Sequence, residues 1–169
     1  TVYKKNNKPR KKILFLGYNR DKTKLIDFLL SSDCEIHHTT KMVHKFNYDL
    51  ILCFGYRHIL KASTLAKISC PIINLHISYL PYNRGAHPNF WSFYENTPKG
   101  VTIHLIDSNI DTGPILYQTP VLFDEKELTF REAYNILIYE IETLFHKNMR
   151  DILDFKWKEK LQEGTGTFH

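Results

Sequence analysis

Two short apolar runs that each end in glycine constrain the fold of this chain most. Residues 12–17 (KILFLG) and 48–55 (YDLILCFG) are too short for buried helices and have the composition of buried strands. Between them, residues 22–31 carry apolar side chains at helical spacing. The alternation continues, with strands expected at residues 35–39, 71–77, 101–106 and 115–123 and helices at residues 58–68 and 88–95. Strands that alternate with helices predict an α/β fold with a mainly parallel sheet.

The last expected helix has the clearest beginning. Thr129 and Glu132 form a T-x-x-E capping box, in which each side chain can bond the backbone N–H of the other residue. Apolar residues then recur at helical spacing to about residue 155. Residues 164–169 do not continue this pattern, so we expect a strand or loop that folds back, or the start of a further segment.

The net charge of +5 comes from one end of the sequence. Six of the 23 Lys and Arg residues lie within residues 1–12, which leaves 17 basic against 18 acidic side chains in the remainder. We therefore predict a basic flexible arm at residues 1–12 and one folded domain at residues 13–169. Contact of the arm with a polyanion is the alternative, but a near-neutral body favours a partner other than nucleic acid.

Compartment signals are few. No apolar run is long enough to cross a bilayer, and none near residue 1 resembles a secretory signal, so we expect no membrane partner. Cys34, Cys53 and Cys70 are odd in number and lack CxxC spacing. Reduced thiols in a cytoplasmic protein are the natural interpretation.

Three polar residues near the ends of expected strands can carry chemistry. Asn74 and His76 are two apart in an expected strand, so their side chains share a face. A carboxamide can stabilise an oxyanion, and an imidazole can accept a proton from an amine. Asp111, in the loop at residues 108–113, could orient that imidazole or bridge to it through water. Spacing alone leaves the alternative that these are ordinary polar groups at strand ends.

Four segments resemble one protein family. Residues 74–81 (NLHISYLP) resemble the N-x-H-x-S-x-L-P segment of folate-dependent formyltransferases, and Arg84-Gly85 follows at the family's distance. Residues 100–104 (GVTIH) resemble the family's G-V-T strand, and residues 110–115 (IDTGPI) resemble its D-T-G segment with the catalytic aspartate. The loop at residues 54–60 (FGYRHIL) resembles the one whose backbone lines the pterin pocket. The ordered combination is specific, although each segment alone is modest.

The resemblance implies a Rossmann-like sheet flanked by helices and a formyl donor, N10-formyltetrahydrofolate, with no metal. It implies that Asn74 stabilises the tetrahedral intermediate, that His76 is the acid and base, and that Asp111 holds His76 or a water. The donor would be bound by Tyr56, Arg57, His58, Ile59, Leu60, Asn109 and Ile110.

Residues 80–92 (LPYNRGAHPNFWS) resemble the corresponding segment of nucleotide-sugar N-formyltransferases, which formylate an amino-dideoxy sugar on a nucleoside diphosphate, often dTDP, for surface polysaccharides such as the O-antigen of lipopolysaccharide. The expected acceptor is therefore a sugar such as dTDP-4-amino-4,6-dideoxyglucose. Its expected contacts are Tyr18, Asn19, Arg20, Ser78, Tyr82, Arg84 and Gly85.

Other acceptors remain open. They are glycinamide ribonucleotide and aminoacyl-tRNA, and a non-catalytic module that binds folate or nucleotide is a further alternative. The single glycine after the first strand is too few for a glycine-rich phosphate loop. We also expect no room after the last helix for the additional tRNA domain of the methionyl-tRNA enzymes. The open sheet edges and the long last helix could support a homodimer.

Overall fold

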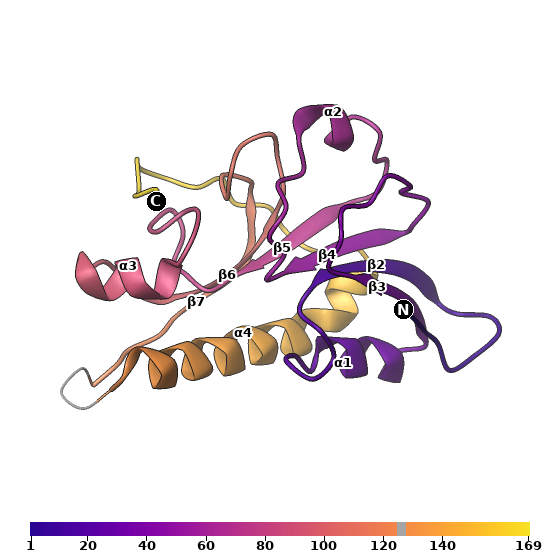
Figure 1. Cartoon of the computed structure of the whole chain (residues 1–169), viewed down its shortest axis with the longest axis horizontal. Coiled ribbons are helices and arrows are strands. Elements are labelled where there is room, and N and C mark those ends of the chain that lie inside the picture. The colour runs from indigo at the N-terminus through magenta and orange to yellow at the C-terminus, as the bar shows by residue number, and fades with distance from the viewer. Residues whose placement is uncertain (125–127) are drawn as a thin grey trace. The chain divides into compact units, whose positions relative to one another are not determined.

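The computed structural model describes residues 1–124 and 128–169 and has the α/β fold that the sequence predicts. Its seven-stranded sheet has the order β1-β3-β2-β4-β5-β6-β7. The chain forms two compact units, residues 1–74 and 75–169, and the boundary falls within strand β5 (Ile72–His76). Figure 1 labels strands β2 to β7 and helices α1 to α4.

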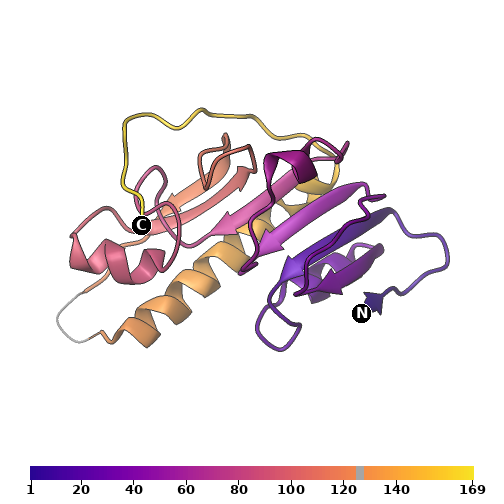
Figure 2. The same ribbon diagram turned by 45° about the horizontal axis from the view of Figure 1, so that its top comes forward.

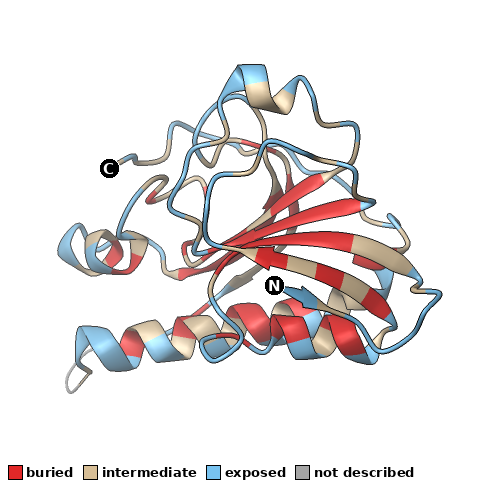
Figure 3. Ribbon diagram, turned by 45° about the vertical axis from the view of Figure 1, so that its right-hand side comes forward, coloured by how far each residue is buried: buried red, intermediate tan, exposed pale blue. Residues whose placement is uncertain are grey.

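The first unit is built on parallel strands. β2 (Lys11–Gly17) pairs in parallel with both β3 (Cys34–Thr39) and β4 (Leu50–Phe54). β2 and β4 are buried along most of their length, as Figure 3 shows, which is typical of parallel strands covered on both faces. Helix α1 (Leu25–Ser31) contributes Leu25, Ile26 and Leu29 to this core, each fully buried. Burial of one such side chain stabilises a fold by about 1.5–3 kcal/mol.

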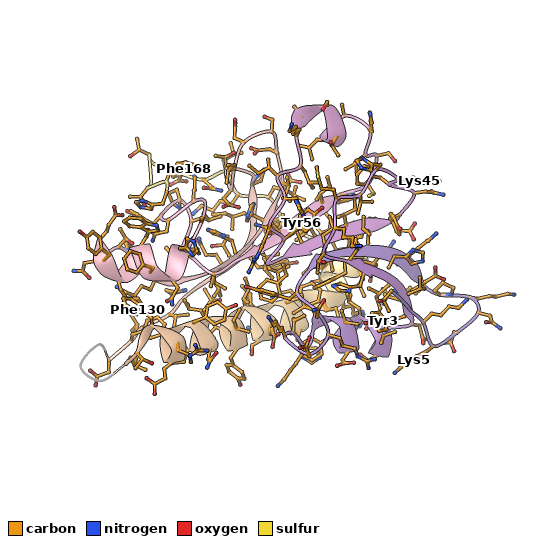
Figure 4. The ribbon with its side chains drawn as sticks, viewed as in Figure 1. Tyr3, Lys5, Lys45, Tyr56, Phe130 and Phe168 are labelled. Carbon is orange, nitrogen blue, oxygen red and sulfur yellow. The ribbon has the colours of Figure 1, made fainter. Side chains whose placement is uncertain are left out.

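The prediction of a flexible arm at residues 1–12 is wrong at both ends of that segment. Val2–Tyr3 forms strand β1, which pairs antiparallel with the edge strand β3, and the arm's last two lysines begin β2. Figure 4 labels Tyr3 and Lys5 in this segment. The sequence did not reveal this strand, because β1 is only two residues long and has no apolar alternation.

The helix expected at residues 58–68 is a single turn, α2 (Ala62–Leu65). None of its residues is buried, and Ile59 is 65% exposed. A short helix without a packed apolar face gains too little to offset its nucleation cost, so the flanking residues stay irregular.

The second unit places a long helix against an antiparallel strand pair. β6 (Gly100–Leu105) pairs with β7 (Ile115–Pro120), and α4 (Phe130–Leu153) packs against both. The predicted capping box of Thr129 and Glu132 is present at the beginning of α4. The core side of α4 is a stripe of buried residues at Ala133, Leu137, Ile141 and Phe145. β7 ends at Pro120, earlier than predicted, because proline cannot donate a ladder hydrogen bond.

A segment after α4, residues 160–169, folds back over the second unit, and we call it the strap. It first pairs with β7, through two backbone hydrogen bonds between Lys160 and Ile115. It then reaches the loop between β5 (Ile72–His76) and α3 (Pro88–Tyr94), as the yellow trace in Figure 2 shows. Phe168, labelled in Figure 4, belongs to the strap and forms a parallel bridge with Arg84. This confirms the expected fold-back of residues 164–169.

Candidate active site

Two of the three predicted catalytic residues meet in the second unit. His76 is the last residue of β5, and Asp111 lies in the loop between β6 and β7, which we call the β6–β7 loop (residues 106–114). The His76 Nε2 atom is 3.7 Å from Asp111 Oδ2. Both side chains are largely buried, with 9% and 12% of their surfaces exposed. The pair that the sequence predicts is therefore close enough to interact electrostatically.

Backbone groups of the β5–α3 loop (residues 77–87) hold this pair. His76 Nε2 lies 2.9 Å from the carbonyl oxygen of Asn83, and the N–H of Gly85 donates to Asp111 Oδ2 at 2.9 Å. A carbonyl oxygen can only accept, so Nε2 of His76 carries the proton and Nδ1 carries the lone pair. The atom of His76 that can take a proton from a substrate is therefore Nδ1.

The D-T-G sequence shapes the β6–β7 loop. Asp111 has a left-handed backbone, with φ 53°, which aspartate tolerates better than most residues. A Cβ on Gly113 would lie 1.8 Å from the Leu105 carbonyl oxygen, so only glycine lets the loop return this close to β6. Asp107 supports the turn by accepting from Thr112 Oγ1 at 2.7 Å and from the Asn109 N–H at 3.1 Å.

A second histidine, for which no role was expected, contacts the carboxylate. His104 Nε2 is 3.4 Å from Asp111 Oδ1, and His104 is 1% exposed. Its Nδ1 atom faces the carbonyl oxygen of Leu105 at 2.8 Å. The sequence did contain a signal for His104. Thr102 and His104 are two positions apart, so their side chains share one face of a strand that ends beside the D-T-G loop.

The protonation states follow from burial and charge. Burial lowers the pKa of His76 below its ordinary value of 6.5, and it outweighs the opposing attraction of Asp111. Burial alone would raise the pKa of Asp111. The charge of His76, contacts with His104 and the N–H of Gly85 together hold that pKa well below its ordinary value of 3.8. Near neutral pH the site therefore holds a neutral imidazole beside a carboxylate.

Acid is expected to destabilise the folded chain through this pair. Folding lowers both pKa values, so the unfolded chain binds these protons more readily than the folded chain. The stability from a neutral His76 is complete above pH 6.5 and declines as the pH falls below that value. Thermal melts at about pH 8 and about pH 5 test this. The melting temperature of the wild-type chain should decrease more between these two pH values than that of His76→Gln, whose side chain does not titrate. The exposed-site variant His44→Ala should lose as much as wild type, and equal losses for wild type and His76→Gln would contradict the assignment.

Asn74, the third predicted catalytic residue, lies two positions before His76 in β5 and is half-buried. It is the last residue of the first unit.

The predicted donor-binding residues lie in two loops. Tyr56 to Leu60 follow β4 outside any helix or strand, and Arg57, His58 and Ile59 are exposed. The Tyr56 hydroxyl donates to the Lys41 carbonyl oxygen at 3.1 Å, and the Tyr56 ring lies edge-on to His58. Figure 4 labels Tyr56 after β4. Asn109 and Ile110 are exposed in the β6–β7 loop, directly before Asp111.

Some of the side chains predicted to bind the acceptor already contact other residues of the chain. In the first unit, Tyr18 packs edge-on against Phe54, Asn19 is exposed, and Arg20 pairs with Asp27 through Nη2 at 2.6 Å. In the second unit, buried Ser78 donates to the carbonyl oxygen of the half-buried Tyr82 at 2.8 Å.

Arg84 and Gly85 have partners that the sequence interpretation did not include. Gly85 donates to Asp111, as described above, and the guanidinium group of Arg84 bonds Gln162 and Thr165 of the strap. No local pattern could have identified Gln162, since it lies outside any helix or strand and 51 positions beyond Asp111.

A buried His–Asp pair at a strand end of an α/β sheet can accept and return a proton, which acyl transfer to an amine requires. Among the described residues, no group of three His, Cys, Asp or Glu side chains is arranged to hold a metal ion. In the part of the chain outside residues 125–127, no helix is both long and apolar enough to cross a membrane.

Comparison with known proteins identifies the family. The model of the formyl transferase family matches residues 11–140, and the chain belongs to this family. The resemblance of the four sequence segments is thereby confirmed.

Solved structures and a curated relative agree with this assignment. The formyltransferase PseJ from Anoxybacillus kamchatkensis was solved with UDP-4,6-dideoxy-4-formamido-L-AltNAc and tetrahydrofolate. It is 42% identical, with a TM-score of 0.86 over 94% of this chain and 85% of its own. A 4-N formyltransferase from Francisella tularensis has the same fold, with a TM-score of 0.84 at 23% identity over 96% of this chain and 77% of its own.

The curated relative is a dTDP-4-amino-4,6-dideoxyglucose formyltransferase of Mycobacterium tuberculosis. It is 39% identical over 71 residues, which are 42% of this chain and 30% of that enzyme. The chain thus spans less than a third of the length of this relative.

Proposed function

We propose that this chain is a folate-dependent N-formyltransferase, with residues 13–169 as its catalytic domain. It transfers the formyl group of N10-formyltetrahydrofolate to the amino group of a nucleotide-linked 4-amino-4,6-dideoxy sugar. The observation that carries the proposal is the buried pair of a neutral His76 and an ionised Asp111 in a formyl transferase fold. The complex of PseJ with a formamido sugar nucleotide and tetrahydrofolate supports the same reaction.

The chain's own residues account for each proton. The acceptor amine attacks the formyl carbon, and His76 Nδ1 removes a proton from the amine nitrogen. Asp111 stabilises the imidazolium that forms, because it is a carboxylate 3.7 Å from the ring. The Asn74 carboxamide donates to the oxygen of the tetrahedral intermediate. His76 then returns its proton to N10 of the departing tetrahydrofolate, and the products are the formamido sugar and tetrahydrofolate.

Backbone groups of residues 56–60 would bind the pterin ring, together with Asn109 and Ile110. Residues 57–59 are exposed and lie outside any helix or strand, which supports this role. Tyr18, Asn19, Arg20, Tyr82, Arg84 and Gly85 remain the proposed contacts of the sugar nucleotide. Ser78 is also a proposed contact, and its hydroxyl already donates to the carbonyl oxygen of Tyr82.

Two relatives favour a sugar that carries its amine at carbon 4. One was solved with a UDP-linked 4-formamido sugar, and the other is named for a dTDP-linked 4-amino sugar. UDP is the better-supported nucleotide, because PseJ is similar over 94% of this chain and the mycobacterial enzyme over 42%. The product would enter a surface polysaccharide such as lipopolysaccharide O-antigen. We place the enzyme in the cytoplasm, in agreement with its three free cysteines, and we propose a homodimer that does not bind nucleic acid.

A formyl-transfer assay tests this function. The chain is mixed with N10-formyltetrahydrofolate and one acceptor at a time, and products are identified by mass. The acceptors are UDP-, dTDP- and GDP-linked 4-amino and 3-amino dideoxy sugars, together with glycinamide ribonucleotide. We expect a formyl mass gain on a 4-amino sugar, with the UDP-linked compound turning over fastest. If only glycinamide ribonucleotide is formylated, the acceptor is that compound and not a nucleotide sugar. If no acceptor is formylated, the proposed function is contradicted.

A further inference from the structure

The strap makes a second set of contacts with the site, centred on the side chain of Gln162. Its Nε2 atom donates to the carbonyl oxygen of Asp111 at 2.8 Å and to that of Gly113 at 2.9 Å. Its Oε1 atom accepts from Arg84 Nη2 at 2.8 Å and Nε at 3.1 Å. Both N–H groups and both lone pairs of the carboxamide are therefore used, which is the full capacity of this side chain.

The two loops that Gln162 joins are the ones that hold the reacting groups. The β6–β7 loop carries Asp111, whose own carbonyl oxygen Gln162 binds. The β5–α3 loop carries Gly85, whose N–H binds the Asp111 carboxylate, and Asn83, whose carbonyl oxygen binds His76. A displacement of one loop relative to the other would therefore change the distance between His76 and Asp111.

Four consecutive backbone N–H groups of the β5–α3 loop donate either to the strap or to Asp111. Those of Asn83, Arg84 and Ala86 donate to the strap, to Thr167 Oγ1, Thr167 O and His169 O. The N–H of Gly85, which lies between them, donates to Asp111. The strap therefore fixes the loop on both sides of the one N–H group that binds the carboxylate.

The backbone of Asp111 needs such support. Its φ of 53° is in the left-handed region, which costs a residue with a side chain free energy relative to a right-handed conformation. The two hydrogen bonds from Gln162 hold the carbonyl groups on either side of Thr112 in the orientation that this turn requires.

We propose that Gln162 is a positioning residue of the active site, which sets the location of the Asp111 carboxylate against His76. Its amide N–H groups position Asp111 by binding the carbonyl oxygens of Asp111 and Gly113, and its oxygen binds Arg84. The proposal deepens the proposed formyl-transfer function and rests on it for its kinetic consequences, but the placement of Asp111 can be measured without turnover.

The variant that isolates the amide N–H groups is Gln162→Glu. It keeps the size of the side chain and an oxygen for Arg84, but it places an oxygen against the carbonyl groups of Asp111 and Gly113. Gln162→Leu removes both sets of hydrogen bonds. The matched control is Glu163→Gln, an amide–carboxylate exchange of the opposite sense at the adjacent exposed position.

The first measurement is amide hydrogen exchange by NMR on the whole chain. We expect the Gly85 N–H to exchange at least about tenfold faster in Gln162→Glu and in Gln162→Leu. The Arg84 N–H, which donates to the strap, should change less than about threefold in Gln162→Glu, and Glu163→Gln should match wild type at both amides. Unchanged exchange at Gly85 would overturn the proposal. So would equal acceleration at Gly85 and Arg84 in Gln162→Glu, since the amide would then support the loop as a whole.

The second measurement is steady-state formyl transfer. Misplacement of a reacting group lowers turnover more than substrate binding, so we expect kcat to fall by about 10- to 100-fold in Gln162→Glu, with KM for both substrates within about threefold of wild type. A rise in KM with unchanged kcat would overturn the positioning role. If wild-type chain has no activity on any acceptor, the proposed function fails, and the exchange experiment still decides the role of Gln162.

Discussion

Replacement of His76 with alanine is expected to lower kcat/KM for formyl transfer by about 10²- to 10⁴-fold, the usual contribution of a general acid–base. The variant loses the imidazole at the end of β5 that is expected to accept a proton from the amine, and Asp111 is too weak a base to replace it. Donor binding should remain within about threefold of wild type, since backbone groups are expected to bind the pterin. Steady-state rates and tetrahydrofolate titration measure the two effects.

The matched control for this variant is His44→Ala, which removes an exposed histidine from the loop before β4. It should retain wild-type kinetics. Turnover within about threefold of wild type in His76→Ala would reject His76 as the acid and base. A loss of donor binding equal to the loss of kcat/KM would instead assign His76 to substrate binding.

Asp111→Asn is expected to lower kcat by about 10²- to 10³-fold, with little change in KM. The asparagine keeps the shape of the side chain and an oxygen for the Gly85 N–H, but it removes the charge that stabilises an imidazolium at His76. Rapid-quench measurement of a single turnover would show whether the loss lies in the chemical step. The loss should lie in the chemical step, because the charge of the carboxylate stabilises the imidazolium that forms when His76 takes a proton.

Asp151→Asn serves as the control, because it removes one carboxylate from the exposed side of α4. Its rates should equal those of wild type. A chemical step of unchanged rate in Asp111→Asn would show that the charge of Asp111 is dispensable, and the role of the carboxylate would then be limited to the bond with Gly85.

The sequence predicted those parts of the fold that follow a repeating pattern. The buried runs at β2 and β4 and the capping box of α4 are local signals, and each forms where its pattern indicates. Strand β1 is too short to show a pattern, and α2 is shorter than predicted because its residues find no core to pack against. Both differences concern elements for which tertiary contacts, rather than local preference, decide the outcome.

The site was predictable where side chains carry the chemistry. His76 and Asp111 meet as their residue types and strand-end positions suggested. Much of what orients them was not predictable, because Asn83 and Gly85 act through backbone atoms that are the same in every residue. Gln162 acts through its side chain, but it contacts Asp111 from 51 positions away in a segment without regular structure.

The separation of the strap from the β5–α3 loop has a consequence for protein synthesis. Thr167 bonds Asn83, which precedes it by 84 positions, so these two groups cannot meet until residue 167 has left the ribosome. A nascent chain that has released β5, β6 and β7 already contains His76 and Asp111, but the loop between β5 and α3 still lacks its partners. The growing polypeptide should therefore acquire a correctly ordered centre only after residue 167 emerges, and earlier chain lengths should carry an unfinished one.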